Sequence, residues 1–153
     1  ILPPRAEATS PKYVQSPAEG RIRSLNDAPL NPKAKYVLYW TQINRRVEAN
    51  HALAHAIHLG NQLKLPVLVY EGLTCTYREA NDRIHTFVLE NVPETAAALE
   101  RLGIGYVFYL RARRTDPNDA LYRLAEDAAA VVTDDFPVFI VREHLERVPG
   151  KLK

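Results

Sequence analysis

The chain has 153 residues, of which 46% are hydrophobic and 25% are charged, and its formal net charge is +2. This length fits one globular domain, and the small net charge excludes a protein that binds nucleic acid through a strong overall field. A single cysteine excludes an internal disulfide framework and indicates a reducing compartment, so we expect a cytoplasmic protein. The longest apolar runs are far shorter than the roughly 18 residues of a membrane-spanning helix. Because the sequence opens with Ile1 and lacks methionine, we expect it to be a piece of a longer protein.

Residues 1–35 differ in composition from the rest of the chain. They contain six of the eleven prolines and carry six basic against three acidic side chains, which is a net charge of +3. A proline-rich segment with few apolar side chains cannot bury enough surface to order itself. We therefore expect an N-terminal arm that lies along the surface or is partly disordered, with contact to DNA or to a partner as the alternative.

The domain that we expect over residues 36–150 begins with strand, helix and strand. The apolar run 36–40 is typical of a strand buried on both faces. A helix follows over about 46–63, because its apolar residues recur at helical spacing and Lys64-Leu65-Pro66 ends the pattern. The second strand covers 66–70, with Pro66 at its first position, where the missing N–H does little harm.

The alternation continues to the end of the domain. A helical segment over about 78–102 contains Pro93, which predicts a kink or two abutting helices. A third strand covers 104–110, Asp116-Pro117 is predicted to start the next helix, and a fourth strand covers 130–133, with a fifth at 138–141. This pattern predicts an α/β fold of the Rossmann-like kind. We expect a doubly wound, five-stranded parallel sheet in the order 3-2-1-4-5, with helices on both faces.

On such a fold a ligand binds beyond the carboxyl ends of the strands, at the point where the strand order reverses. Neither a G-x-G-x-x-G fingerprint nor a phosphate-binding Walker loop is present, which argues against an ordinary NAD or ATP enzyme. The N-terminus of the helix near Arg46 favours an anion at the same edge. The predicted ligand-binding residues are Trp40, Thr41, Arg46, Glu71, Arg111 and Asp134.

Each of these candidates has a plainer structural interpretation. Trp40 can belong to the strand core or stack on a flat chromophore. Arg111 can lie in a solvated loop or hold a phosphate together with its neighbouring arginines. Asp134 and Asp135 are predicted to point to opposite sides of a strand, so one can cap the next turn and one can face a bound ligand.

A metal site and a catalytic centre are both poorly supported by the sequence. His51, His55 and His58 share a helix face, but that face is predicted to point to solvent rather than to hold a metal. No group of residues combines a nucleophile, a base and an oxyanion site, so we predict no catalytic residues.

Three stretches of the sequence form a recognisable pattern. The first contains Tyr39-Trp40 followed by Arg46-Val47-Glu48, Asn50 and Ala52-Leu53. The second contains Arg83-Ile84-His85, Phe87 and Leu89-Glu90, and ends with Gly103-Ile104. The third is a strand ending in Thr133-Asp134, with Pro137 after it. Over about 35–145 this pattern resembles the N-terminal domain of the class II cyclobutane pyrimidine dimer photolyases, in the photolyase/cryptochrome superfamily, with Ala49 in place of the family's aspartate.

The resemblance implies a role in DNA repair. A class II deoxyribodipyrimidine photolyase is a flavoprotein lyase that uses light and reduced FAD to split cyclobutane pyrimidine dimers in damaged DNA. Its flavin lies in a C-terminal helical domain, which this chain lacks, so the fragment alone is expected to be inactive and to hold no FAD. Its N-terminal domain is expected to cradle an antenna chromophore of the deazaflavin or folate type.

The residues alone leave two other interpretations of the function open. The chain can be a free-standing nucleotide- or pigment-binding α/β module that performs no repair. It can also be an interaction module that docks on a separate helical flavoprotein.

Overall fold

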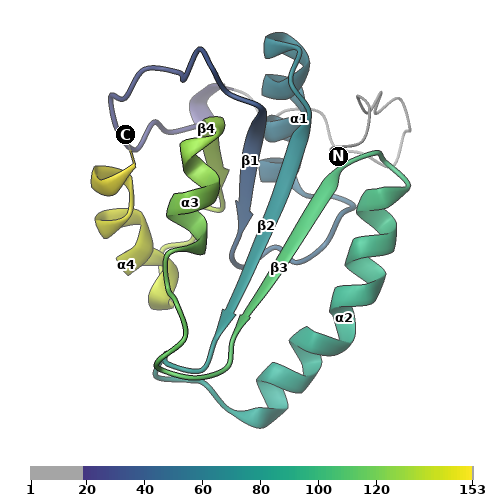
Figure 1. The fold of residues 1–153 in the computed structure, drawn as a ribbon, viewed down its shortest axis with the longest axis vertical. Coiled ribbons are helices and arrows are strands. Elements are labelled where there is room, and N and C mark those ends of the chain that lie inside the picture. Colours follow the sequence, from purple (N-terminus) through teal and green to yellow (C-terminus); the bar gives the residue numbers. More distant parts are fainter. Residues whose placement is uncertain (1–18, 153) are drawn as a thin grey trace.

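The computed structural model describes residues 19–152 and contains one parallel sheet of four strands in the order β3-β2-β1-β4 (Figure 1). The strands are β1 (Tyr36–Thr41), β2 (Val67–Thr74), β3 (Gly105–Arg111) and β4 (Ala128–Thr133). The α-helices are α1 (His51–Leu63), α2 (Asp82–Glu100), α3 (Ala120–Glu126) and α4 (Phe139–Arg147), and short 3₁₀ helices cover η1 (Glu19–Arg21) and η2 (Pro149–Lys151). The α/β class, the parallel sheet and the order of its four strands confirm the prediction from the sequence.

Each face of the sheet packs against its own pair of helices. On one face, Tyr39 and Val69 pack with Leu53 and Ile57 of α1 and with Leu99 of α2. On the other face, a second cluster joins Leu38, Trp40 and Tyr70 to Leu121 of α3 and to Val148, just after α4. The sheet is therefore doubly wound. Figure 1 shows α3 and α4 together on the same side of it.

The central strand β1 is buried along its whole length, as its continuous apolar run predicts. It pairs with β2 in an unbroken register from Val37↔Val67 to Thr41↔Glu71. Its pairing with β4 contains an irregularity, because Tyr36 lies opposite Ala128 whereas Leu38 lies opposite Val131. The carboxyl ends of these strands meet at one edge of the sheet, which is where the candidate site lies.

The fifth strand predicted at 138–141 is wrong, because these residues lie at the start of α4. A short apolar run fits a strand and a buried helix turn equally well. Val141 is almost fully buried, and Leu145 and Val148 follow it at helical spacing, with Val148 also buried. In the described part of the chain, β4 is thus an edge strand.

Two predicted helix starts and one predicted break need correction. The first helix starts at His51 rather than near residue 46, because Ala49 has a positive φ of 50° and Asn50 caps the helix in an extended conformation. The helix predicted to begin at Asp116-Pro117 starts at Ala120 instead. The second helix continues through Pro93 as one element, so the alternative of two abutting helices is wrong, while a kink at Pro93 stays a prediction.

Residues 19–35 run beside β4 and the carboxyl-terminal helices. Asn26 donates its side-chain amide to the Pro149 carbonyl at 3.0 Å, and the backbone N–H of Asn31 donates to the Ala129 carbonyl at 3.4 Å. An exposed ion pair joins Arg23 to Asp135. The predicted arm also includes residues 1–18, which lie outside the described residues.

No helix within residues 19–152 is both long enough and apolar enough to cross a membrane.

Candidate functional site at the carboxyl ends of the strands

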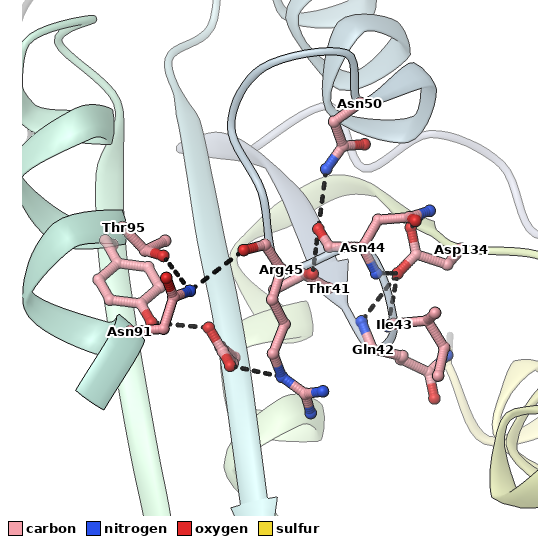
Figure 2. A network of polar contacts seen from close by, with 11 residues as sticks. Thr41, Gln42, Ile43, Asn44, Arg45, Asn50, Asn91, Thr95 and Asp134 are labelled. Carbon is pink, nitrogen blue, oxygen red and sulfur yellow. Dashed lines mark hydrogen bonds and ion pairs between the residues drawn. The ribbon is translucent and has the colours of Figure 1, made fainter. Parts of the chain in front are cut away.

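The loop between β1 and α1 is folded around the carboxylate of Asp134, the residue that follows β4. Oδ2 of Asp134 accepts hydrogen bonds from the backbone N–H groups of Gln42, Ile43 and Asn44 at 2.9, 3.0 and 3.2 Å. Oδ1 accepts from the Tyr39 hydroxyl at 2.9 Å and from the Asn44 side chain at 3.2 Å. Figure 2 shows the three loop residues converging on this carboxylate. Asp134 is only 3% exposed, so these bonds form in a poorly hydrated environment, where charge-assisted hydrogen bonds are strong.

Asn50 ties the other end of the loop to the helix and the sheet. Its side-chain oxygen accepts the N–H of Leu53 at 2.9 Å, which caps α1. Its amide nitrogen lies 3.0 Å from the Tyr39 hydroxyl and 2.9 Å from the Arg46 carbonyl oxygen. Asn50 therefore caps α1 and braces the turn that precedes it. Burial, and secondarily the nearby charge of Asp134, raises the pKa of Tyr39, so its hydroxyl stays a neutral donor.

Glu71, at the carboxyl end of β2, is held by an arginine that the sequence analysis did not select. Nε of Arg45 donates to Glu71 Oε1 at 2.7 Å, and the hydroxyl of Tyr106 donates to Oε2 at 2.8 Å. Asn91 of α2 donates to the Arg45 carbonyl at 3.2 Å, which fastens the loop to the helix (Figure 2). The Glu71 side chain is 2% exposed and that of Arg45 28%, so this ion pair is far better shielded than the surface pairs of the chain.

Two cationic groups remain available on this loop. Arg45 uses its Nε for Glu71, and Arg46 uses its Nε for the Ala49 carbonyl at 3.2 Å. Neither arginine makes a hydrogen bond through its two terminal nitrogens to any group within residues 19–152. The loop therefore offers guanidinium donors to an anion at the strand ends.

Trp40 and Thr41 serve mainly in packing and in holding the loop. Trp40 is 9% exposed, and its ring centroid lies 5.3 Å from that of His144 in α4. The Thr41 hydroxyl donates to the Asn44 carbonyl at 3.2 Å. His144 Nδ1 lies 2.6 Å from Gln42 Oε1, and the Gln42 amide donates to the Thr133 hydroxyl at 3.0 Å. These contacts join α4 to the loop that Asp134 organises.

Arg111 holds its own loop together. Its guanidinium donates to the carbonyls of Asp116 and Arg114 at 2.9 and 2.6 Å and to the Thr76 hydroxyl at 3.2 Å. Asp116, which the sequence suggested as a helix cap, instead accepts the N–H of Arg113 at 2.7 Å. Within residues 19–152, each of the three guanidinium nitrogens of Arg111 thus has a protein acceptor.

The structure thus brings Trp40, Thr41, Arg46 and Asp134 together around one loop and places Glu71 on the neighbouring strand. Sequence reasoning missed Arg45, Gln42, His144 and Tyr106 as parts of this region. A local signal existed for Gln42 and Arg45, since both follow the end of β1. The other contacts depend on the tertiary fold. No cluster of metal-binding side chains occurs among the described residues.

The chain is a doubly wound parallel α/β domain. At the carboxyl ends of its strands it has a hydrogen-bonded loop between β1 and α1 instead of a glycine-rich phosphate-binding loop. The DNA photolyase family profile matches residues 37–153, and the chain belongs to that family.

Two relatives extend this assignment. The chain is 37% identical over 132 residues to the deoxyribodipyrimidine photo-lyase of Methanothermobacter thermautotrophicus, which covers 86% of this chain and 29% of that protein. It is 31% identical over 134 residues to the deoxyribodipyrimidine photo-lyase of Arabidopsis thaliana, which covers 84% of this chain and 26% of that protein. The chain therefore spans between a quarter and a third of the length of these relatives.

Among solved structures, a universal stress protein from Archaeoglobus fulgidus matches 64% of this chain and 74% of its own, at 19% identity and a TM-score of 0.42. The family assignment rests on the sequence relatives.

We predict that the folded chain loses stability as the pH falls below about 6.5, in part through His144. Burial lowers the pKa of His144 below the usual 6.5, an effect that the neighbouring charge of Glu143 only partly opposes. Below pH 6.5 the unfolded chain then binds a proton that the folded chain does not, and stability decreases until the pH reaches the folded pKa.

Urea denaturation measured between pH 8 and pH 5 checks this prediction. His144→Gln should flatten the pH dependence. His51→Gln, at an exposed position on α1, should leave it unchanged. The same pH dependence in the unaltered chain and in His144→Gln would refute the assignment to His144.

Proposed function

We propose that this chain is the N-terminal α/β domain of a class II deoxyribodipyrimidine photolyase. The observation that carries the proposal is the 37% identity to the Methanothermobacter photolyase over 86% of the chain. The class II assignment is supported by the motif from Arg46 to Leu53. Asn50 of this motif is 3% exposed, and its hydrogen bonds join β1, the loop and α1. The motif therefore has a structural role in this domain.

In this proposal the repair chemistry belongs to the longer protein. When bound, reduced FAD supplies an electron to the pyrimidine dimer after absorbing light. The flavin would lie in the part of the photolyase beyond this chain, as the resemblance to the class II photolyases implies. This domain would act as a scaffold for the flavin domain and as a holder of an antenna pigment. A fifth strand beside β4 belongs to the same proposal.

A chimera tests the proposal. Residues 19–152 replace the matching 132-residue region of the Methanothermobacter photolyase, and light-dependent loss of cyclobutane dimers from ultraviolet-irradiated DNA is measured. We expect repair in the light and none in the dark, because the domains of one family should support the same assembly. The Methanothermobacter protein with its matching region deleted serves as the control. A soluble chimera that retains FAD but repairs no dimers in the light would contradict the proposal.

The antenna pigment is proposed to lie at the strand ends, among Trp40, Thr41, Arg46, Glu71, Arg111 and Asp134. Arg46 offers the clearest support, because it is exposed and its terminal nitrogens are free of partners within the described residues. An acidic side chain of a deazaflavin or folate pigment can pair with such a guanidinium. Arg45, on the same loop, would supply a second cation.

Titration of a deazaflavin and a folate pigment into the chain tests this site. Arg46→Gln should weaken binding by about tenfold, the equivalent of one charge-assisted hydrogen bond. Arg83→Gln, at an exposed position on α2, should bind as the unaltered chain does. Equal affinity for the unaltered chain and Arg46→Gln would place the pigment elsewhere, and no binding of either pigment would contradict an antenna role for this domain alone.

A further inference from the structure

We propose that residues 20–35 form a strap along the domain, and that Asn26 is the latch by which this strap holds the carboxyl-terminal turn η2 and Leu152 in place. Three features of the described residues carry the inference. They are an anchored end of the strap next to β1, a middle part that is only loosely packed, and one side chain that joins the strap to η2. The inference concerns contacts within this chain and goes beyond the proposed function.

The end of the strap that leads into β1 is anchored at the start of β4. The side chain of Asn31 donates to the Glu126 carbonyl at 3.1 Å, and its backbone N–H donates to the Ala129 carbonyl at 3.4 Å. Lys35 makes two contacts with Asp127, one through its backbone N–H at 2.8 Å and one through its ammonium group at 2.9 Å. The strap therefore has a fixed point from which its other residues extend.

The middle of the strap is only loosely packed on the domain. No residue over 20–35 is buried, and only Leu25, Asn31 and Ala34 are half-buried. Most residues over 21–31 and all residues of β4 line the same cavity of about 520 Å³, so the strap does not pack closely along this strand. Pro29 and Pro32 restrict the backbone between the contacts. Because the strap covers little apolar surface, its position depends on individual hydrogen bonds.

Asn26 supplies the contact between the strap and η2. Its side-chain amide donates to the Pro149 carbonyl at 3.0 Å and to the Leu152 carbonyl at 3.4 Å. An asparagine amide has two N–H donors, so one side chain can serve both carbonyls. The hydroxyl of Ser24 donates to the Asn26 carbonyl at 2.7 Å, which holds the backbone of the strap at this point. Asn26 thus joins groups that are 123 and 126 residues away in the sequence.

The other polar contact of this part of the strap cannot replace the latch. Arg23 pairs with Asp135 at 3.1 Å, but the two side chains are 62% and 63% exposed, and exposed ion pairs contribute little. Asp135 also lies in the loop after β4 rather than in η2. Within residues 19–152, no other hydrogen bond or ion pair joins the strap to η2 or to Leu152.

The turn η2 has little stability of its own. It covers three residues, Pro149–Lys151, and its internal bonds are those from Lys151 to the Val148 carbonyl at 2.9 Å and from Leu152 to the Pro149 carbonyl at 3.2 Å. So short a 3₁₀ helix has poor hydrogen-bond geometry. One further hydrogen bond to each end of the turn therefore matters more here than it would in a long helix.

The latch has a consequence for the longer photolyase, which rests on the proposed function. The polypeptide that follows the matched region in such a protein would start from η2. Because Asn26 fixes η2, the strap would determine where that polypeptide leaves the α/β domain. Asn26 would then be a positioning residue for the rest of the protein, without contact to flavin, pigment or DNA.

Backbone order parameters from NMR relaxation test the latch in the 153-residue chain. Asn26→Asp keeps the size of the side chain but replaces the donor by a carboxylate oxygen, which carbonyl oxygens repel. The order parameters over 150–152 should fall from roughly 0.85, the value of a rigid backbone, to below about 0.6. Asn26→Ala, which removes the donor without adding a charge, should give the same loss. Asp27→Asn, at the adjacent exposed position, makes the reverse chemical change and should leave the order unchanged.

Several results would overturn the proposal. These are low order over 150–152 in the unaltered chain, unchanged order in Asn26→Ala, or an equal loss in Asp27→Asn. A loss that extends equally through α4 and α2 would show a general loosening of the domain and would also overturn it. Because this measurement needs neither light, flavin nor DNA, it can fail while the chimera repairs dimers, and the reverse.

Discussion

The arrangement of the strand ends depends on one buried carboxylate. Asp134 follows β4, yet its hydrogen bonds go to the loop that follows β1, so it joins two neighbouring strands where their ladder ends. Its Oδ2 accepts hydrogen bonds from three successive backbone N–H groups, those of Gln42, Ile43 and Asn44, of which Gln42 is itself buried. A buried N–H group that lacks an acceptor costs about 1–3 kcal/mol. The carboxylate removes that cost at Gln42, and through all three bonds it fixes the path of the loop.

The rest of the site follows from this fixed loop. Once residues 42–44 are held, Asn50 is in place to cap α1, and Arg45 reaches the buried carboxylate of Glu71 on β2. A buried ion pair of this kind contributes little net stability, but loss of either partner would leave an uncompensated charge, so it favours one arrangement over others. Arg45 and Arg46 are thereby presented at the strand ends in a defined position.

The sequence predicted the α/β class and the order of the four observed strands, because continuous apolar runs and helical spacing are local signals. It failed where a local pattern had two solutions. The apolar run 138–141 predicts a strand as readily as a helix. The buried positions of Val141 and Val148, which are seven residues apart and lie on one helix face, show that it forms a helix. Likewise, α1 starts later in the chain than predicted because Ala49 has a positive φ. A sequence gives little indication that a residue other than glycine adopts a positive φ.

The candidate site was predictable in position but not in detail. Parallel strands place their carboxyl ends at one edge, so Trp40, Glu71 and Asp134 could be assigned to the same region from their places in the sequence. The partners of these residues could not be predicted, because they are distant in the sequence. Asp134 is 90 to 92 residues from the loop that it binds, and Glu71 is 35 residues from Tyr106. Asp134 binds the loop after β1 rather than the turn that follows it in the chain, and its neighbour Asp135 makes an exposed ion pair.

The most direct test of this account compares Asp134→Asn with Asp135→Asn in chemical denaturation. Both changes remove one charge from adjacent residues and preserve side-chain size, but the Asp135 side chain is 63% exposed and pairs only with an exposed arginine in the described part of the chain. The account predicts that Asp134→Asn lowers the free energy of unfolding by roughly 3 kcal/mol, since several hydrogen bonds to a buried charge are weakened. Asp135→Asn should change it by less than about 0.5 kcal/mol. Equal stability of the two variants would contradict the central role of the Asp134 carboxylate.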